Sequence, residues 1–512
     1  MSRALLAVPL AIALLAWGSG VYHVEFDYDE VMQAHTIWMI TQGLVPFRDF
    51  FECHPPFVWY LYAPAFALLP DGPELLFGLR ILSVLGNAAW FAALVSAARA
   101  ARPALRAEWL ALAAILAASH PLVIYFGAQF RPDAWIWAAA FAALARAIRL
   151  RAGFRRAAEL GAAGSLCALA LPKLALLFPA YAALDLARRQ VSRSEPQASE
   201  DHRVGEPLAR DLAGYAVGIA LGMAAAAAFL FAVGIDPLTA WDLSVVYHGY
   251  VAAHYGTGTD GPLWFQVATA HASLAVVFAT LLAWAAWLRR ERAAPTTLEL
   301  AVLATCAGQL LLVPFPYVQY TAPMFVLPAI FAPYCGAWAE AIAARRPHLP
   351  RAVLASACAI AAGLAVRPLA GSWGLRDAAD FAGYQRLVAE LAPPDARIAV
   401  APPFHPVVRR DAFYGLVQTW MPSGLTTEET LRRLALPYRE RVGAAVYLRE
   451  LEETRPAVVL FTDERVLYSP EQRQAIAAYL TRHVRDYRRV GTITPALWVR
   501  ADLVVASQPR LP

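Results

Sequence analysis

The sequence predicts a mainly α-helical protein that crosses a membrane many times and ends in a small α/β domain. Of its 512 residues, 59% are apolar and only 16% are charged, against ~25% charged in an ordinary soluble domain. Charge is also uneven along the chain: 369–512 holds 35 of the 83 charged residues, and 1–368 holds the other 48. We therefore expect two domains, a membrane domain over 1–368 and a water-soluble domain over 369–512 outside the cytoplasm.

Eleven apolar segments approach the length of about 20 residues that a membrane-spanning helix needs. They cover 4–22, 75–98, 107–126, 134–150, 157–171, 174–187, 211–234, 263–288, 298–313, 321–343 and 351–367. The fifth and sixth are short and are separated by Pro172, so they form either two tilted spans or a re-entrant pair. The first is predicted to be an anchor, because no clear cleavage site follows it.

Arginines concentrate in alternate loops, which predicts the orientation. Short loops rich in Lys and Arg stay in the cytoplasm. With the N-terminus inside, the inner loops hold twenty arginines, and the outer loops hold only Arg48, Arg131 and Lys173. The net charge of +5 follows from this placement, so it does not indicate a nucleic-acid partner.

The C-terminal segment alternates strand-like and helix-like pieces. Short apolar runs at 396–401 and 457–461 and an alternating run at 496–505 predict strands. Helical spacing at 427–433 and 471–487 predicts helices between and after them. A small α/β domain is the resulting prediction.

Several common enzyme motifs are absent from the sequence. It has no P-loop, no dinucleotide-binding glycine pattern and no HExxH. The five cysteines are scattered and show no zinc-binding spacing. Nucleotide-driven transport and zinc proteolysis of that type are therefore not supported.

The first outer loop, 23–74, is acidic and aromatic. It carries eight carboxylates, and Arg48 is its only Lys or Arg. The apolar residues that follow Asp29 and Glu30 predict an amphipathic helix along the membrane surface, and a second apolar stretch, 57–70, is too short to span. The loop is either a water-facing segment with interfacial anchors or an active-site loop held by two surface helices.

Two further outer residues carry charge next to prolines. Asp133 opens the fourth predicted span after Arg131 and Pro132, where it either caps the helix or joins Asp29 and Glu30 in general-base chemistry. Lys173 is the only lysine of the chain. It either reaches to the interface or binds an anionic group such as a lipid phosphate.

Weaker candidates lie in the other outer loops. Tyr317, Gln319 and Tyr320 close the ninth predicted span and are candidate substrate contacts. Glu52 and His54 offer oxygen and imidazole donors, so a divalent metal ion is a candidate cofactor, although two residues do not make a site. His248 and His254 are predicted to be ordinary loop histidines.

In their order along the chain, four motifs resemble the GT-C membrane glycosyltransferases. They are Asp29-Glu30, the segment from Gly43 to Pro56, Arg131-Pro132-Asp133 and Leu171-Pro172-Lys173. The likeness is greatest to bacterial family 39 members, related to protein O-mannosyltransferases and lipid A aminoarabinose transferases, and it covers about residues 1–340. It implies the GT-C fold and a donor sugar carried on polyprenyl phosphate at the outer membrane face.

The resemblance also implies roles for these residues. Asp29 becomes the base that activates the acceptor, with Glu30 beside it and Asp133 as the second acid. Lys173 and Arg48 become phosphate contacts. Glu52 matches a family position linked to metal or substrate binding in some members, and Cys53-His54 departs from the Lys-Pro that follows this position in the aminoarabinose branch.

These observations predict an inverting glycosyltransferase. It would move a hexosyl or pentosyl unit from a polyprenyl-phosphate donor to a hydroxyl of an envelope lipid, glycan or protein. We expect it in the bacterial cytoplasmic membrane, surrounded by membrane lipid, with its active site on the periplasmic or extracellular side. The alternatives are a transporter or lipid flippase, which would need charged residues along a central pathway, and a non-catalytic envelope scaffold.

Overall fold

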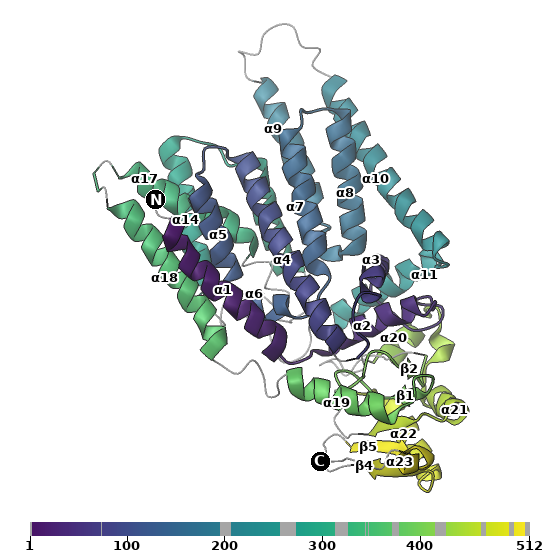
Figure 1. Cartoon of the computed structure of the whole chain (residues 1–512). Helices are drawn as coiled ribbons and strands as arrows, with labels where there is room; N and C mark the ends of the chain where they lie inside the picture. The colour runs from purple at the N-terminus through teal and green to yellow at the C-terminus, as the bar shows by residue number, and fades with distance from the viewer. Residues whose placement is uncertain are drawn as a thin grey trace. The chain divides into compact units, whose positions relative to one another are not determined.

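The computed structural model describes residues 3–72, 74–194, 206–255, 273–312, 326–343, 345–346, 348–370, 378–414, 426–461, 467–490 and 496–506. Over these residues the chain is mainly helical, and its strands form one sheet (Figure 1). It divides into two compact units, which are described separately. Unit 1 comprises Met1–Val21, Ile81–Phe229 and Asp260–Trp373, and unit 2 comprises Tyr22–Arg80, Leu230–Thr259 and Gly374–Pro512. The domain boundary predicted after residue 368 stays a prediction.

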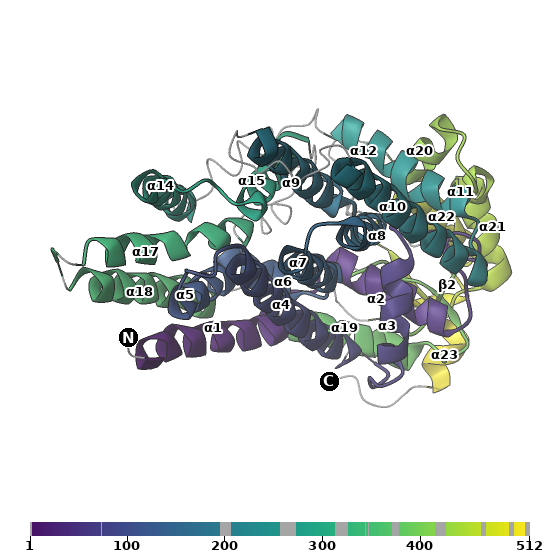
Figure 2. The ribbon, with the colours of Figure 1, turned by 90° about the horizontal axis from the view of Figure 1, so that it is seen from above.

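Unit 1 is built almost entirely of helices. They are α1 (Arg3–His23), α4 (Glu74–Ala101), α5 (Ala107–Ala118), α6 (Pro121–Ala128), α7 (Asp133–Arg149), α8 (Phe154–Ala170), η1 (Pro172–Leu174), α9 (Leu177–Ser194), α10 (Glu206–Ala232), α14 (Ser273–Glu291), α15 (Thr297–Leu312), η4 (Leu327–Phe331), α17 (Pro333–Ala341) and α18 (Leu349–Ala370), of which α1, α4 and α10 continue into unit 2. Helices α7, α8, α9 and α10 lie side by side, and α17 packs against α5 and α18 (Figure 2).

The predicted number of eleven membrane spans is not confirmed. In the described part of the chain, four helices are long and apolar enough to cross a membrane: Leu5–His23, Glu74–Ala101, Leu208–Ala232 and Leu349–Val366. The bent pair α5 and α6 would make a fifth. The predicted spans 263–288, 298–313 and 321–343 lie partly outside the described residues.

One predicted span is broken at a proline, and a second proline separates two predicted spans, as expected. The span predicted over 107–126 consists of α5 and α6, which meet at an angle of 68°. Pro121 opens α6, and His120 before it has the extended backbone that a following proline favours. Pro172 likewise starts η1, which separates α8 from α9, so 157–187 forms two distinct helices.

Glycines let α8 and α10 approach closely in unit 1. A Cβ on Gly218 of α10 would lie 2.1 Å from the carbonyl oxygen of Ala158, and one on Gly161 of α8 would lie 2.5 Å from that of Tyr215. Helices in membranes commonly pack through such small residues, since lipid gives no hydrophobic drive for helix association. The contact indicates that α8, the helix that precedes η1, packs closely against α10.

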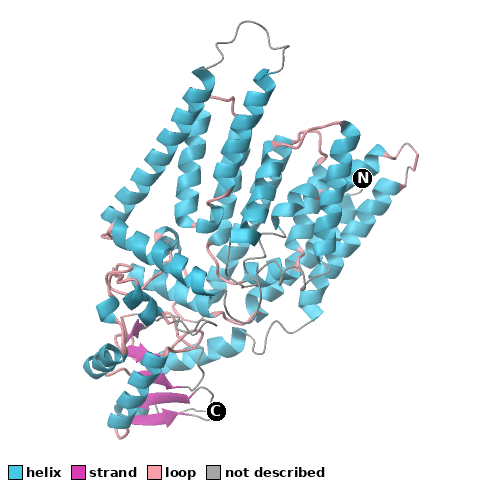
Figure 3. Ribbon diagram, turned by 180° about the vertical axis from the view of Figure 1, so that it is seen from behind, coloured by secondary structure: helices cyan, strands magenta, loops and turns pink. Residues whose placement is uncertain are grey.

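Unit 2 combines short helices with the sheet (Figure 3). Its helices are α2 (Tyr28–Thr41), α3 (Phe57–Phe66), α11 (Pro237–Trp241), the π-helical turn η2 (Asp242–Val246), α12 (Tyr247–Tyr255), α19 (Ala378–Leu391), α20 (Thr427–Arg433), η5 (Arg439–Arg441), α21 (Ala444–Thr454), α22 (Pro470–Arg482) and α23 (Ala501–Ala506). Its strands are β1 (Arg397–Ala399), β2 (Arg410–Asp411), β3 (Val458–Phe461), β4 (Tyr487–Val490) and β5 (Ala496–Arg500). The sheet order is β2-β1-β3-β5-β4, parallel from β2 to β3 and antiparallel from β3 to β4.

Most predicted C-terminal elements are present, with two corrections. Strands β1 and β3 and helix α20 lie where the spacing places them. The strand predicted over 496–505 ends at Arg500, and the chain continues as α23. The helix predicted over 471–487 ends at Arg482, and Tyr487 belongs to β4, because pairing with β5 outweighs the local helical spacing.

Helix α2 forms where the sequence predicts a helix, but it is not exposed on one face. Every residue from Glu30 to Met39 is buried, including the polar Gln33, His35 and Thr36. A helix lying along a membrane surface would keep its polar side in water. His35 and Thr36 of α2 instead have hydrogen-bond partners within unit 2, as described below.

Candidate functional site

The segment between α2 and α3 is held by the buried carboxylate of Glu52. Its Oε2 accepts a hydrogen bond from Thr36 Oγ1 of α2 (2.8 Å). Its Oε1 accepts from the backbone N–H groups of Cys53 (2.9 Å) and His54 (3.0 Å) and lies 2.8 Å from His54 Nδ1. These bonds, together with the charge of His54, outweigh burial and lower the pKa of Glu52. Both oxygens are occupied, so Glu52 fixes the loop.

Asp29 and Glu30 lie in the first turn of α2 with different surroundings. Glu30 is fully buried against Arg80, whose Nε lies 2.6 Å from Oε1 and whose NH2 lies 2.7 Å from Oε2. Arg80 also donates to the carbonyl oxygens of Val24 and Glu25. Asp29 is half-buried. Glu30 therefore anchors the start of the helix, and Asp29 is the one of the two carboxylates that is partly exposed to solvent.

The hydroxyl group of Tyr28 is buried beside Asp29. It has no hydrogen-bond partner in the described part of the chain. Burial, together with the charge of Asp29, raises the pKa of Tyr28 well above its ordinary value. The phenol therefore keeps its proton and offers a hydrogen-bond donor next to the carboxylate. No sequence pattern singled out this residue.

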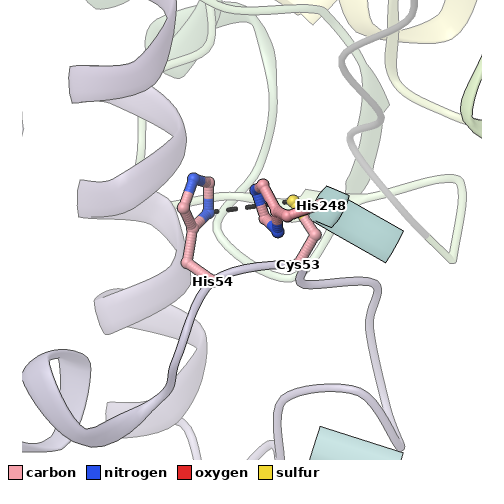
Figure 4. Close-up of side chains that lie close together, drawn as sticks. All are labelled: Cys53, His54 and His248. Atoms are coloured by element: carbon pink, nitrogen blue, oxygen red, sulfur yellow. Dashed lines mark hydrogen bonds between the residues drawn. The ribbon is translucent and has the colours of Figure 1, made fainter. Parts of the chain in front are cut away.

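Cys53, His54 and His248 form a cluster in unit 2. Cys53 and His54 are neighbours on the loop before α3, and His248 belongs to α12 (Figure 4). One ligand atom of each lies within 4.8 Å of the others. Cys53 Sγ lies 3.8 Å from His54 Nδ1, and the His54 and His248 rings are 5.2 Å apart between centroids.

The donor set of this cluster fits a divalent metal such as zinc. His248 Nδ1 lies 3.1 Å from the carbonyl oxygen of Ser244, so Nδ1 carries the proton and Nε2 keeps its lone pair. Metal-binding histidines are typically oriented by such a bond. Burial, reinforced by His54, lowers the pKa of His248 to about 3, so its ring is neutral. Burial raises the pKa of Cys53, and the neighbouring Cys53 and Glu52 raise the pKa of His54 well above its ordinary value despite burial, so a metal ion would have to displace a proton from both side chains.

Unit 1 brings Asp133 and Lys173 together. Lys173 Nζ of η1 lies 2.6 Å from Asp133 Oδ2 of α7, and the two side chains are 25% and 32% exposed. Asp133 is the first residue of α7 and not its N-cap, which is Pro132. The only lysine of the chain is thus paired with a predicted acid, at a position that solvent still reaches.

The predicted cations Arg48 and Arg131 have close partners. Arg48 NH2 lies 2.8 Å from Asp49 Oδ2, and the guanidinium is more than half exposed. Arg131 Nε donates to Gln129 Oε1 (3.1 Å), and its backbone N–H donates to Ser83 Oγ (3.0 Å). Tyr317, Gln319 and Tyr320 lie outside the described residues.

Three sets of polar residues contact one another in the structure without having been predicted from the sequence. Arg80 was counted within an apolar span, although a charge there calls for an acidic partner. The cysteines show no zinc-binding spacing, and the six residues from His248 to His254 fit no helical metal pair, so neither Cys53 nor His248 entered the predicted metal set; His248 lies on α12 and not in a loop. His35, His405 and Asp411, which cluster in unit 2, follow no recognisable spacing.

Comparison with known proteins finds a structural likeness over the whole chain. No protein-family model and no curated protein matches the sequence. The crystal structure of ArnT from Cupriavidus metallidurans bound to undecaprenyl phosphate matches with a TM-score of 0.61 and 14% identity, covering 100% of both chains. The apo structure of the same protein matches with a TM-score of 0.60 and 15% identity, covering 98% of this chain and 99% of that one. The chain therefore has the fold of ArnT, in agreement with the GT-C fold that the resemblance of its motifs implied.

Proposed function

We propose that the protein is an inverting membrane glycosyltransferase that uses a polyprenyl-phosphate sugar as donor. The observation that carries this proposal is the likeness, over the full length of both chains, to ArnT solved with undecaprenyl phosphate. The acceptor is a hydroxyl group of an envelope lipid, glycan or protein. We place the enzyme in the bacterial cytoplasmic membrane with its active site on the periplasmic side, as the arginine distribution predicts.

Asp29 is the proposed general base. The acceptor hydroxyl attacks the anomeric carbon and gives its proton to a carboxylate, while the bond from that carbon to the phosphate oxygen breaks. Glu30 has both oxygens engaged by buried Arg80, so it orients α2 instead of taking the proton. Direct displacement predicts inversion at the anomeric carbon.

The donor phosphate needs cations. A lipid phosphate leaves as an anion, so positive groups serve it better than a strong acid does. Lys173 is proposed as one such group, because its partner Asp133 holds it at a partly exposed position. Arg48 and Arg131 are proposed as further contacts. Tyr317, Gln319 and Tyr320 remain proposed substrate contacts.

A divalent metal ion is a proposed cofactor of unit 2. Cys53, His54 and His248 would hold it, and Glu52 would position His54 through the bond to Nδ1. When bound, such an ion would supply positive charge near the loop that follows α2. The proposed transfer has no step on this ion, because residues of the chain bind the substrates, orient them and accept the proton.

Transfer from a synthetic donor tests the proposal. The purified full chain in lipid nanodiscs is mixed with undecaprenyl phosphate-linked aminoarabinose, or with an undecaprenyl phosphate-linked hexose, and an envelope lipid extract. We expect sugar transfer with release of undecaprenyl phosphate. Asp29→Asn should lower turnover by about 10²- to 10⁴-fold, the range for a positioned general base.

Asp27→Asn is the matched control. Asp27 is the N-cap residue of α2, two residues before Asp29, and takes no part in the proposed proton transfer, so we expect turnover close to that of the wild type. Wild-type turnover in Asp29→Asn would refute the assignment of the base. Solute or lipid movement across proteoliposomes, with no transfer from any donor, would instead favour a transporter.

A further inference from the structure

A cluster of three buried titratable residues joins α2 to the C-terminal sheet within unit 2. His35 lies on α2, His405 follows β1, and Asp411 belongs to β2. Their side chains are 1%, 0% and 8% exposed. The ring centroids of His35 and His405 are 4.3 Å apart. Neither the proposed transfer reaction nor the proposed metal centre uses these residues.

The hydrogen-bond partners of His35 define its protonation state. Its Nε2 lies 2.7 Å from Asp411 Oδ2, and its Nδ1 lies 2.5 Å from the carbonyl oxygen of Val407. A carboxylate and a carbonyl oxygen only accept hydrogen bonds, so both ring nitrogens must donate. The ring of Trp38 also stacks on His35 at 5.4 Å, which suits a cation. His35 is therefore an imidazolium paired with Asp411.

The partners of His405 argue against a metal ion in this cluster. The backbone N–H of Val407 donates to His405 Nδ1 (3.0 Å), so the proton of the neutral ring is on Nε2. That nitrogen lies 3.2 Å from Asp411 Oδ1 and has no lone pair for a metal. His35 and Asp411 thus form a hydrogen-bonded ion pair, and the neutral ring of His405 lies next to the second carboxylate oxygen of Asp411.

We propose that His35 is a positioning residue, which as a buried imidazolium shared by Asp411 and the Val407 carbonyl locks α2 onto the C-terminal sheet. His35 lies six residues after Asp29 on the same helix, so this bond sets the placement of the base. The inference rests on the proposed function for its catalytic consequence, whereas the ion pair itself is independent of it. The C-terminal segment then acts on the reaction through α2.

The protonation state is tested without any substrate. Full-length protein labelled with ¹⁵N-histidine in nanodiscs is examined by long-range ¹H–¹⁵N spectroscopy, and the His35 signal is assigned by its loss in His35→Gln. We expect both nitrogens of His35 to carry protons at neutral pH, and Asp411→Asn to convert the ring to a singly protonated form. A singly protonated His35 in the wild type, or a metal ion lost on His405→Gln, would overturn the proposal.

The catalytic consequence is tested with a double-mutant cycle. We expect His35→Gln and Asp411→Asn each to lower kcat by about 10- to 100-fold, as a displacement of about 1 Å does, with little change in KM for the lipid donor. The double variant should lose no more than either single variant, because it holds a neutral, matched pair. A double variant that loses no more kcat than the single variants indicates a positioning role, whereas additive kcat losses would indicate that each change disturbs the fold by itself.

His483→Gln is the matched control. His483 also has two acidic partners, Glu452 at 2.7 Å and Asp486 at 3.1 Å, but these lie on α21 and just after α22. We expect it to keep wild-type kcat. Equal losses in His483→Gln and His35→Gln, or full kcat in His35→Gln, would refute positioning. An inactive wild type with a doubly protonated His35 would refute only the proposed function.

Discussion

Arg80 and Glu30, fifty residues apart, form an ion pair from which solvent is fully excluded, with contacts of 2.6 and 2.7 Å. Two further donors of Arg80 go to the carbonyl oxygens of Val24 and Glu25. Breaking a buried pair leaves one charge without compensation, which costs far more than losing an exposed ion pair. This relationship fixes where α2 begins relative to the end of the preceding helix.

We therefore expect Glu30→Gln or Arg80→Met to lower the free energy of unfolding by about 3–5 kcal/mol. Thermal unfolding followed by size-exclusion chromatography measures this effect. The double variant Glu30→Leu with Arg80→Met should recover much of the loss, because no unpaired charge stays buried. Arg149→Gln is the control, since that arginine is exposed and its partner among the described residues is the uncharged Ser96. A small loss in both single variants would contradict the expectation.

Lys173 gives a prediction about donor binding. Replacing it with glutamine removes the ammonium group and should raise KM for the lipid-phosphate donor about 10- to 100-fold, since a hydrogen bond to a charged group contributes ~1.5–3 kcal/mol. Lys173→Arg keeps the charge and should recover part of the affinity. Steady-state kinetics with a range of donor concentrations measures both. An unchanged KM in Lys173→Gln would show that the phosphate binds elsewhere.

The cluster of Cys53, His54 and His248 predicts metal binding. We expect the purified protein to bind zinc, detected by elemental analysis after competition with a chelating dye. Cys53→Ser or His248→Gln should weaken binding at least tenfold, because even changes beyond the direct ligands cost about 10- to 100-fold.

His254→Gln is the control for this experiment. Its Nδ1 also lies close to the carbonyl oxygen four residues earlier (2.8 Å), but it is exposed and stands outside the cluster. Zinc affinity should therefore stay unchanged in this variant. Equal affinity in the wild type and His248→Gln would exclude the site.

The cluster around Asp411 predicts sensitivity to acid. Burial, reinforced by His35, lowers the pKa of His405 to about 4, below the ~6.5 of an unfolded chain. The unfolded chain therefore binds more protons between these values, and stability falls as the pH drops from ~6.5 towards 4, by about 3 kcal/mol at most. Burial alone would raise the pKa of Asp411, but His35 and His405 lower it to about 2. Its contribution is full above ~3.9 and is lost as the pH falls towards 2.

Denaturant unfolding at several pH values checks this prediction. In His405→Gln, the loss of stability between pH 6.5 and 4 should become clearly smaller than in the wild type, with the remainder coming from other buried histidines such as His248, while the loss below pH 4 remains. The same acid dependence in the variant and the wild type would assign the effect to other groups.

The membrane region and α20 were predictable because their signals are local. Thr426 caps α20 by accepting from the backbone N–H of Glu429, so the helix starts where the sequence indicates. The strand β4 was not predictable in this way. Its residues continue a helical spacing, and only their pairing with β5 makes them a strand.

The residue types of the site were predictable from the sequence, but the contacts between these residues were not. Charge scarcity drew attention to Asp29, Asp133 and Lys173, and the pair of Asp133 with Lys173 is present. Glu30 and Asp29 have different roles because Arg80 pairs with Glu30. The partners of His35 lie more than 370 positions away in the sequence. No local pattern encodes such contacts.

The bond between His35 and Asp411 spans 376 positions, and this sets an order of events during synthesis. Helix α2 leaves the ribosome early, yet its partner strand is made only after some four fifths of the chain. At about 5–20 residues per second, the nascent protein spends roughly 20 to 80 seconds with α2 held by Arg80 but without its bond to Asp411. A nascent chain that stops before β2 would therefore be a poor catalyst, since the strand that positions its base helix is still missing.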